Sequence, residues 1–98
     1  MSISKQYLKS RPVCKVTFVV SAAEANEVIV VGDFNEWNPE ATALKKLKNG
    51  NFKGTCEIPK DNSYEFRYII DGNYTNEQEA DGFQWNDFAG TENAILYV

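Results

Sequence analysis

The sequence predicts an all-β protein, an antiparallel β-sandwich of immunoglobulin-like type with about seven short strands. Short stretches alternate apolar and polar residues, clusters of Asn, Gly and Pro separate them, and no stretch has a convincing helical period. At 98 residues the chain is near the usual size of one domain and can bury a core without disulfide staples. We expect residues 1–11 to be a polar lead and residues 12–98 to form the sandwich.

The first two predicted strands lead to a turn that carries a tryptophan. Residues 13–20 alternate, which indicates one buried and one solvated face. Residues 28–31 are four consecutive β-branched residues, which is typical of a buried strand. Turn-forming residues then place Trp37 among polar neighbours, so we expect its indole to be half exposed. We interpret Asp33 and Asn35 as residues that cap this turn.

A hairpin signal organises the middle of the chain. Residues 49–50 are Asn-Gly, which favours a tight turn between two antiparallel strands. We therefore expect a short strand at residues 44–48 and its partner at residues 52–58. Residues 64–70 alternate again, with aromatic and aliphatic side chains on one face, and this pattern places Arg67 on the solvent side.

Residues 76–92 form the longest stretch without a period. Loops of this length are uncommon in compact domains unless they bind something or pack on themselves. Three aromatic residues, Phe83, Trp85 and Phe88, lie in this stretch, and we interpret them as loop packing more than as ligand contacts. The last strand is expected at residues 93–98.

The composition argues against several kinds of chemistry. The chain has no histidine, so a serine or cysteine nucleophile lacks its commonest general base and zinc lacks its commonest nitrogen ligand. No glycine-rich phosphate loop or calcium-loop spacing occurs, and we expect no cofactor. A glycosidase pair of carboxylates needs a deep cleft, which a sandwich of this size rarely has. We therefore expect a protein that is not an enzyme.

Charge and hydrophobicity bound the partners and the location. A formal net charge of −4 disfavours nucleic acid as a partner, since binding it requires a clustered basic surface. The sequence has no apolar leader and no apolar run long enough to span a bilayer, so we expect no membrane association and a cytoplasmic location. Cys14 and Cys56 are too few for a disulfide framework and are expected to be buried free thiols.

Three planar side chains are expected outside the core: Trp37, Arg67 and Tyr74. Sugar rings present apolar C–H faces and a rim of hydroxyl groups, so proteins hold them by aromatic stacking and by hydrogen bonds from Asn, Lys or Arg. Two or three such contacts predict weak binding, with Kd on the order of micromolar to millimolar.

Three segments resemble a known family. Residues 31–37, 64–74 and 90–93 are similar to the hallmark segments of carbohydrate-binding module family 48, also called the isoamylase N-terminal or early-set domain. That family includes the glycogen-binding domain of the AMP-activated kinase β subunit. The resemblance covers about residues 12–98, and residues 5–18 resemble small stand-alone bacterial members.

The resemblance implies an early-set immunoglobulin-like sandwich that binds α-1,4-linked glucans such as glycogen, starch or maltodextrin. By their places in the motifs, Trp37 and Tyr74 would be stacking platforms. Arg67 would take the place of a lysine that bonds sugar hydroxyls, and Asn93 would be a polar contact. The loop expected to support the glucan chain consists of Ala89, Gly90 and Thr91.

Some positions depart from the family pattern. Tyr74 stands in place of a tryptophan and offers less area, while arginine at position 67 keeps the charge but changes the donor geometry. Ala94 stands where a second asparagine is common, which removes one polar contact. An alternative is therefore a protein-interaction or regulatory early-set domain without sugar binding. A further hypothesis is a subunit that assists a glycogen- or starch-active enzyme.

Overall fold

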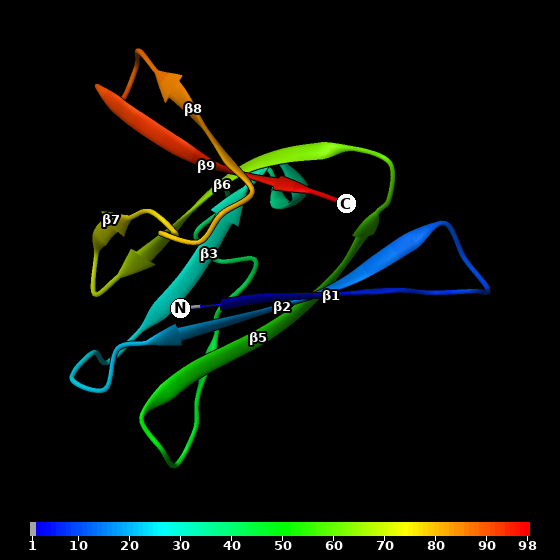
Figure 1. Ribbon diagram of the computed structural model, residues 1–98. Helices are drawn as coiled ribbons and strands as arrows, with labels where there is room; N and C mark the ends of the chain where they lie inside the picture. Colours follow the sequence, from blue (N-terminus) through cyan, green and yellow to red (C-terminus); the bar gives the residue numbers. More distant parts are fainter. Residues whose placement is uncertain (1) are drawn as a thin grey trace.

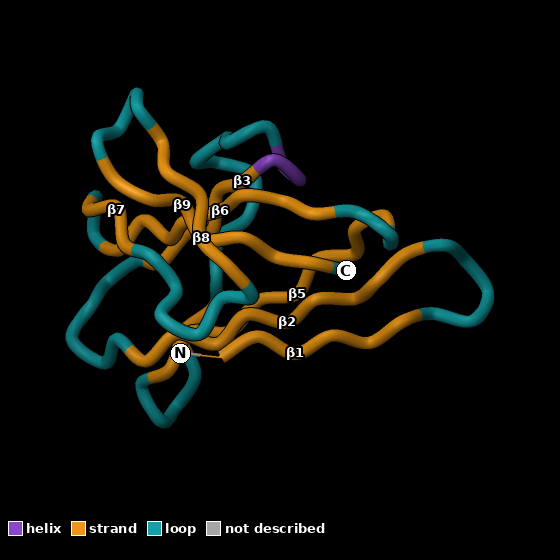
Figure 2. The backbone as a smooth tube through the Cα atoms, turned by 45° about the horizontal axis from the view of Figure 1, so that its top comes forward, coloured by secondary structure: helices purple, strands orange, loops and turns teal. Residues whose placement is uncertain are grey.

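The computed structural model describes residues 2–98, which form two antiparallel β-sheets packed face to face (Figure 1). Over these residues the chain makes nine strands and a single turn of 3-10 helix (Figure 2). The predicted sandwich is therefore confirmed, with more strands than the sequence indicated. Met1, the first residue of the predicted lead, lies outside the described range.

The first sheet has the strand order β1-β2-β5-β4. Its strands are β1 (Ser2–Tyr7), β2 (Val13–Ser21), β5 (Asn51–Pro59) and β4 (Lys45–Lys46). The polar lead thus supplies an edge strand, because its backbone pairs with β2 from Ser2↔Val19 to Tyr7↔Cys14 although its side chains are mostly exposed. The Asn-Gly hairpin is confirmed, but β4 is only two residues long.

The second sheet has the order β3-β6-β9-β8, with a further short strand on β6. Its strands are β3 (Val28–Gly32), β6 (Ser63–Ile70), β9 (Thr91–Tyr97), β8 (Gly82–Asn86) and β7 (Asn73–Thr75). The prediction of a long loop at residues 76–92 is wrong in its second half, because residues 82–86 pair with β9 as an antiparallel hairpin. Phe83 and Trp85 alternate with Gln84 and Asn86 in this edge strand, and so short an alternation did not distinguish the strand from the loop.

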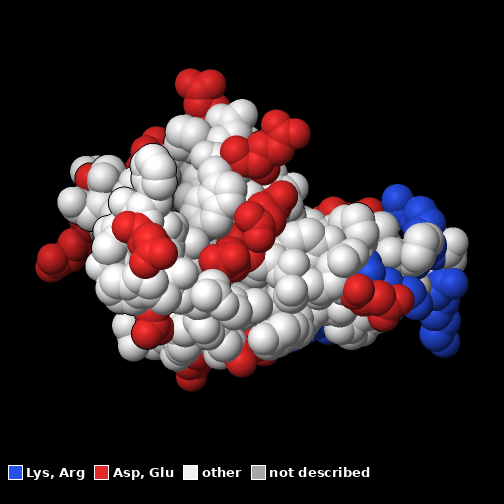
Figure 3. All heavy atoms as spheres, turned by 90° about the horizontal axis from the view of Figure 1, so that it is seen from above, with Lys and Arg blue, Asp and Glu red and all other residues white. Residues whose placement is uncertain are grey.

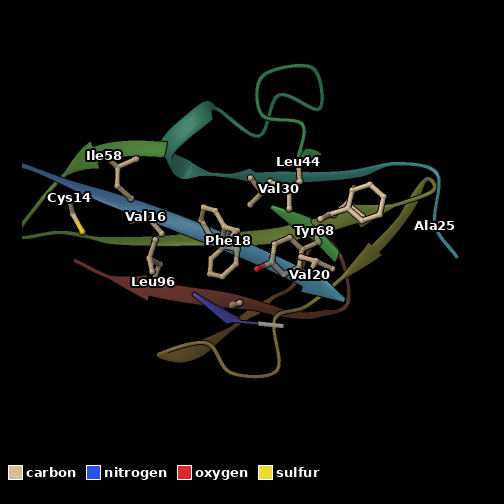
Figure 4. Packing of buried hydrophobic residues seen from close by; sticks show 14 residues of the cluster. Cys14, Val16, Phe18, Val20, Ala25, Val30, Leu44, Ile58, Tyr68 and Leu96 are labelled. Carbon is tan, nitrogen blue, oxygen red and sulfur yellow. The ribbon is translucent and has the colours of Figure 1, made fainter. Parts of the chain in front are cut away.

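The core lies between the sheets and is rich in aromatic rings (Figure 4). The ring centroid of Phe18 on β2 lies 5.6 Å from that of Phe66 and 6.2 Å from that of Tyr68, both on β6. Cys14 is buried in this core, whereas Cys56 is only half-buried, and both thiols are free. The expectation of two buried thiols holds for the first and is wrong for the second, because Cys56 lies at the margin of the core.

One buried polar pair interrupts the apolar core. The Tyr68 hydroxyl donates a hydrogen bond of 2.8 Å to a carboxylate oxygen of Glu77, whose side chain is 0% exposed. The other carboxylate oxygen accepts the backbone N–H of Glu79. Burial, followed by the charge and hydrogen bond of Glu77, raises the pKa of Tyr68, so its hydroxyl keeps its proton and remains a donor.

Strand β3 is buried on both faces, which explains its uninterrupted β-branched run. Val28 and Val30 face the core between the sheets. Ile29 and Val31 face the opposite side, where they pack with Ile69 of β6 and with the side chain of Trp37. In the part of the chain that the structure describes, no helix has the length and apolar character that crossing a bilayer requires.

Candidate functional site

A groove runs over the outer face of the second sheet, the face directed away from the core. Its first part has a volume of about 380 Å³. The residues that line it come from the turn after β3, from β6 and β7, and from the β8–β9 hairpin, and they are Trp37, Arg67, Tyr74, Asn86, Phe88, Ala89 and Asn93. Most of the residues that the sequence predicted for sugar contact therefore meet on one surface.

Trp37 is held over this face by a turn of unusual backbone conformation. Glu36 and Trp37 both have positive φ, at 59° and 57°, in the left-handed region that side chains other than glycine rarely adopt. The backbone N–H of Trp37 donates to the carbonyl of Gly32 over 2.9 Å, which closes the turn. The indole lies half-buried against Ile29 and Val31, as the turn residues predicted.

Asp33 and Asn35 build this turn. The Asn35 side chain accepts the N–H of Gly32 and donates to the carbonyl of Val30, so its predicted capping role is confirmed. One carboxylate oxygen of Asp33 accepts the indole N–H of Trp37 over 2.9 Å, and the other accepts the backbone N–H of Glu65 over 2.8 Å. Asp33 therefore fixes the ring to strand β6, a role that its position in the sequence did not reveal.

Arg67 and Tyr74 form a stacked pair at the other end of this part of the groove. Ile69 pairs with Tyr74 in the β6–β7 register, which brings the tyrosine ring to the outer face. The guanidinium carbon of Arg67 lies 5.2 Å from the centroid of that ring, within cation–π range. The Arg67 Nε is buried without a hydrogen-bond partner, while the Tyr74 side chain remains 55% exposed.

Asn93 lines the same part of the groove as Trp37 and Tyr74 and is only 4% exposed. Its amide nitrogen donates to a carboxylate oxygen of Glu65 over 3.2 Å, which fixes the orientation of the amide because a carboxylate only accepts. Its Oδ1 is buried without a partner, as is Arg67 Nε. A third such atom among the described residues, Asn76 Oδ1, follows β7 and lies outside the groove lining.

The β8–β9 hairpin supplies the remaining wall. The Asn86 side-chain oxygen accepts the N–H groups of Phe88 and Ala89, and Gly90 closes the turn at a φ of 68°. This turn presents the Phe88 side chain fully to solvent. The interpretation of Phe83, Trp85 and Phe88 as loop packing is wrong, since all three are exposed and the last two line the groove.

Not every predicted residue reaches the groove. Gly90 and Thr91 shape the hairpin but do not line its surface. Ala94 faces the core with 0% exposure, so an asparagine side chain at this position would not reach the groove. The expectation that alanine at position 94 removes a polar contact is therefore wrong. Asn86 was missed, and Phe88 was named in the sequence only as a residue of loop packing; the signal for both was an aromatic residue inside a turn-forming stretch.

The electrostatics of this face disfavour an anionic ligand. Carboxylates of Asp33, Glu65 and Asp87 border the groove, whereas Arg67 is the cation in its lining. Figure 3 shows Lys and Arg gathered at the end of the molecule formed by the β1–β2 hairpin, and Asp and Glu spread over the rest of the face in view. Within residues 2–98 no group of three His, Cys, Asp or Glu side chains has the arrangement of a metal site.

An immunoglobulin-like sandwich with exposed rings beside unpaired polar atoms defines a binding module. A family model described as the glycogen recognition site of AMP-activated protein kinase matches residues 15–98, and the chain belongs to that family of carbohydrate-binding modules. A comparison with curated proteins returned no match. Family membership agrees with the motifs seen in the sequence and with the sheet face on which they converge.

Proposed function

We propose that the chain is a non-catalytic binding module for α-1,4-linked glucans such as glycogen, starch and maltodextrins. Trp37 and Tyr74 stack on sugar rings, while Arg67 and Asn93 hydrogen-bond their hydroxyl groups. Ala89 supports the glucan chain from the wall of the groove, and Gly90 and Thr91 shape the hairpin that carries it. The proposal rests on the family and on the geometry of the groove.

The observation that carries the proposal is that two residues lining the groove with Trp37 and Tyr74 hold polar atoms without hydrogen-bond partners. Arg67 Nε is a donor and Asn93 Oδ1 is an acceptor, and both are buried without a protein partner. Leaving such a group unpaired costs about 1–3 kcal/mol. A sugar hydroxyl both donates and accepts, so one oligosaccharide can satisfy both atoms while its C–H faces cover the rings.

A binding role also fits the state of the carboxylates near the groove. Both oxygens of Asp33 accept hydrogen bonds from the protein itself, and Glu65 holds Asn93. These groups position other residues, which is unlike a pair of carboxylates facing each other across a cleft. The sequence has no histidine to supply a general base.

Calorimetric titration with maltoheptaose tests the proposal. We expect Kd on the order of micromolar to millimolar for the native chain, and a rise of at least about ten-fold for Trp37→Ala and for Tyr74→Ala. Tyr7→Ala is the matched control, because Tyr7 is 53% exposed on β1, away from the groove. Absence of heat with the native chain, together with equal mobility on native gels with and without glycogen, would contradict the proposal.

A second candidate is a protein-interaction domain that docks on a glycogen- or starch-active enzyme. The fully exposed Phe88 favours it, because a large ring at a hairpin tip can insert into a partner. Co-purification with such an enzyme that is lost in Phe88→Ala, from a protein that does not retard on glycogen gels, would favour this role over sugar binding.

A further inference from the structure

The groove continues beyond the residues that the family motifs predict. A second part, with a volume of about 560 Å³, adjoins the first and shares Trp37, Asn86, Phe88 and Asn93 with it. Its other lining residues include Glu65, Gln84 and Trp85. Apart from the shared Trp37 and Asn93, none of the residues predicted for sugar contact lines this second part.

The floor of this second part is a row of polar side chains across three strands. Gln84 of β8 pairs with Asn93 of β9 in the hairpin register, so both side chains leave the sheet on the same face. Glu65 of β6 reaches Asn93 from the other side and accepts its amide hydrogen. Hydrogen-bonding groups therefore continue from the first part of the groove toward the edge of the sheet.

The chemistry of this row suits a ligand rich in hydroxyl groups. Asn93 Oδ1 is an unpaired acceptor on a side chain that is 4% exposed, and its residue borders both parts of the groove. Glu65 and Asp33 add carboxylate oxygens, which accept from hydroxyl groups and repel anions. Neutral sugar hydroxyls satisfy this lining, whereas phosphate groups do not.

Trp85 pairs with Glu92 in the hairpin register, so its side chain leaves β8 on the opposite face from that of Gln84. Because β8 is the edge strand, Trp85 borders this second part at the free edge of the sheet. Its side chain is 56% exposed, and its indole N–H donates a 2.7 Å hydrogen bond to the carboxylate of Asp87, which limits rotation of the ring. A fixed and exposed indole beside polar groups is a surface that sugar rings contact well. Phe83, two residues earlier on β8, is 45% exposed but lines neither part of the groove.

We propose that the second part of the groove is an additional sugar subsite, formed by Gln84, Trp85 and the Glu65–Asn93 pair, which takes a glucosyl unit beyond those held by Trp37 and Tyr74. The proposal rests on the glucan-binding function proposed above. It makes the protein selective for longer linear glucans, because a short oligosaccharide fills only the first part of the groove.

Chain-length dependence tests this subsite. Calorimetric Kd values would be measured for maltotriose and maltoheptaose with the native chain and with Trp85→Ala, Gln84→Ala and Phe83→Ala. We expect Trp85→Ala and Gln84→Ala to weaken maltoheptaose binding about three- to ten-fold while maltotriose binding changes less than about two-fold. Phe83→Ala is the matched control and should leave both ligands unchanged. Thermal unfolding of each variant confirms that the exposed substitutions leave the fold intact.

The outcomes separate the two proposals. Native protein that binds both glucans, with maltoheptaose unaffected by Trp85→Ala and by Gln84→Ala, overturns the additional subsite and leaves the proposed function standing. Equal weakening of both glucans also overturns it, because the two residues would then act on the first part of the groove. Native protein that binds neither glucan overturns the proposed function and the subsite together.

Discussion

The two faces of strand β6 differ in whether their polar atoms have hydrogen-bond partners. On the inner face, the Tyr68 hydroxyl is paired with Glu77 and the Tyr64 hydroxyl donates to the carbonyl of Pro59. On the outer face, Arg67 Nε and its neighbour Asn93 Oδ1 are buried without partners. The same strand therefore completes the core on one side and borders two unpaired polar atoms on the other.

The difference teaches how a small sandwich can carry a site without a deep cavity. Packing of the inner aromatic rings is closed, so stability resides there. The outer rings rest on a small apolar cluster of Ile29, Val31 and Ile69 and remain open to solvent. Substitutions on the inner face should lower the free energy of unfolding, whereas substitutions on the outer face should raise the Kd for glucans.

Removing an inner ring should have the largest effect. Phe66→Ala deletes a side chain that is 0% exposed, and we expect the free energy of unfolding to fall by about 3–5 kcal/mol from lost burial and the cavity left behind. Chemical denaturation measures this loss. Arg67→Ala, one residue later on the outer face, is the comparison; a similar loss of stability for Arg67→Ala would break the distinction between the faces.

Breaking the buried Tyr68–Glu77 pair should have the second-largest effect. Tyr68→Phe removes the hydroxyl that donates to Glu77 and leaves one carboxylate oxygen buried without that partner. We expect a loss of about 1–3 kcal/mol in the free energy of unfolding, with glucan affinity unchanged. Denaturant titration and calorimetry measure the two quantities. Unaltered stability would show that the pair does not support the inner face.

The anchor of the indole should affect binding more than folding. Asp33→Ala removes the acceptors of the Trp37 indole N–H and the Glu65 backbone N–H. We expect Kd for maltoheptaose to rise about three- to ten-fold, because the ring is no longer oriented before binding. Faster rotation of the Trp37 ring in time-resolved anisotropy, recorded in a Trp85→Phe background, should accompany it. Glu36→Ala, an exposed carboxylate of the same turn, should leave both unchanged.

The smallest effect concerns the rim where the sheets meet. Partial burial would raise the pKa of Asp81, but hydrogen bonds from Lys5 and the Tyr97 amide and the charge of Lys5 outweigh it, so the pKa is lowered. A carboxylate with a depressed folded-state pKa stabilises the protein above its unfolded pKa and loses that contribution as pH falls through the folded value.

Acid titration of stability measures this contribution. Below about pH 4, near the ordinary pKa of aspartate, the native chain should lose stability more steeply than Asp81→Asn, by less than about 1 kcal/mol because the pair is partly exposed. Lys5 of β1 and Asp81, the residue before β8, form this ion pair, and neither lines the groove. The same dependence of stability on pH in the two proteins would show that Asp81 does not contribute to stability.

Local pattern by itself determined the buried strands and the side of β6 on which Arg67 stands. A strand has a period of two, so alternation assigns each side chain to a face without knowledge of the partner strands. The β-branched run before Trp37 and the turn residues around it likewise predicted a buried strand that ends beneath a half-exposed indole. The motif resemblance then brought Tyr74 and Asn93 into the same predicted site.

Only the tertiary structure decided which residues share the groove and which do not. In strand β8, Phe83 and Trp85 alternate with Gln84 and Asn86, but both aromatic side chains are exposed, because an edge strand need not bury either face. The five-residue alternation therefore marked no buried face, and the pairing with β9 identified the strand. Ala94 faces the core because of the register that β9 adopts against β6. Neighbours across strands depend on pairing between distant segments, and this long-range pairing joins Gln84, Asn93 and Glu65 into one surface.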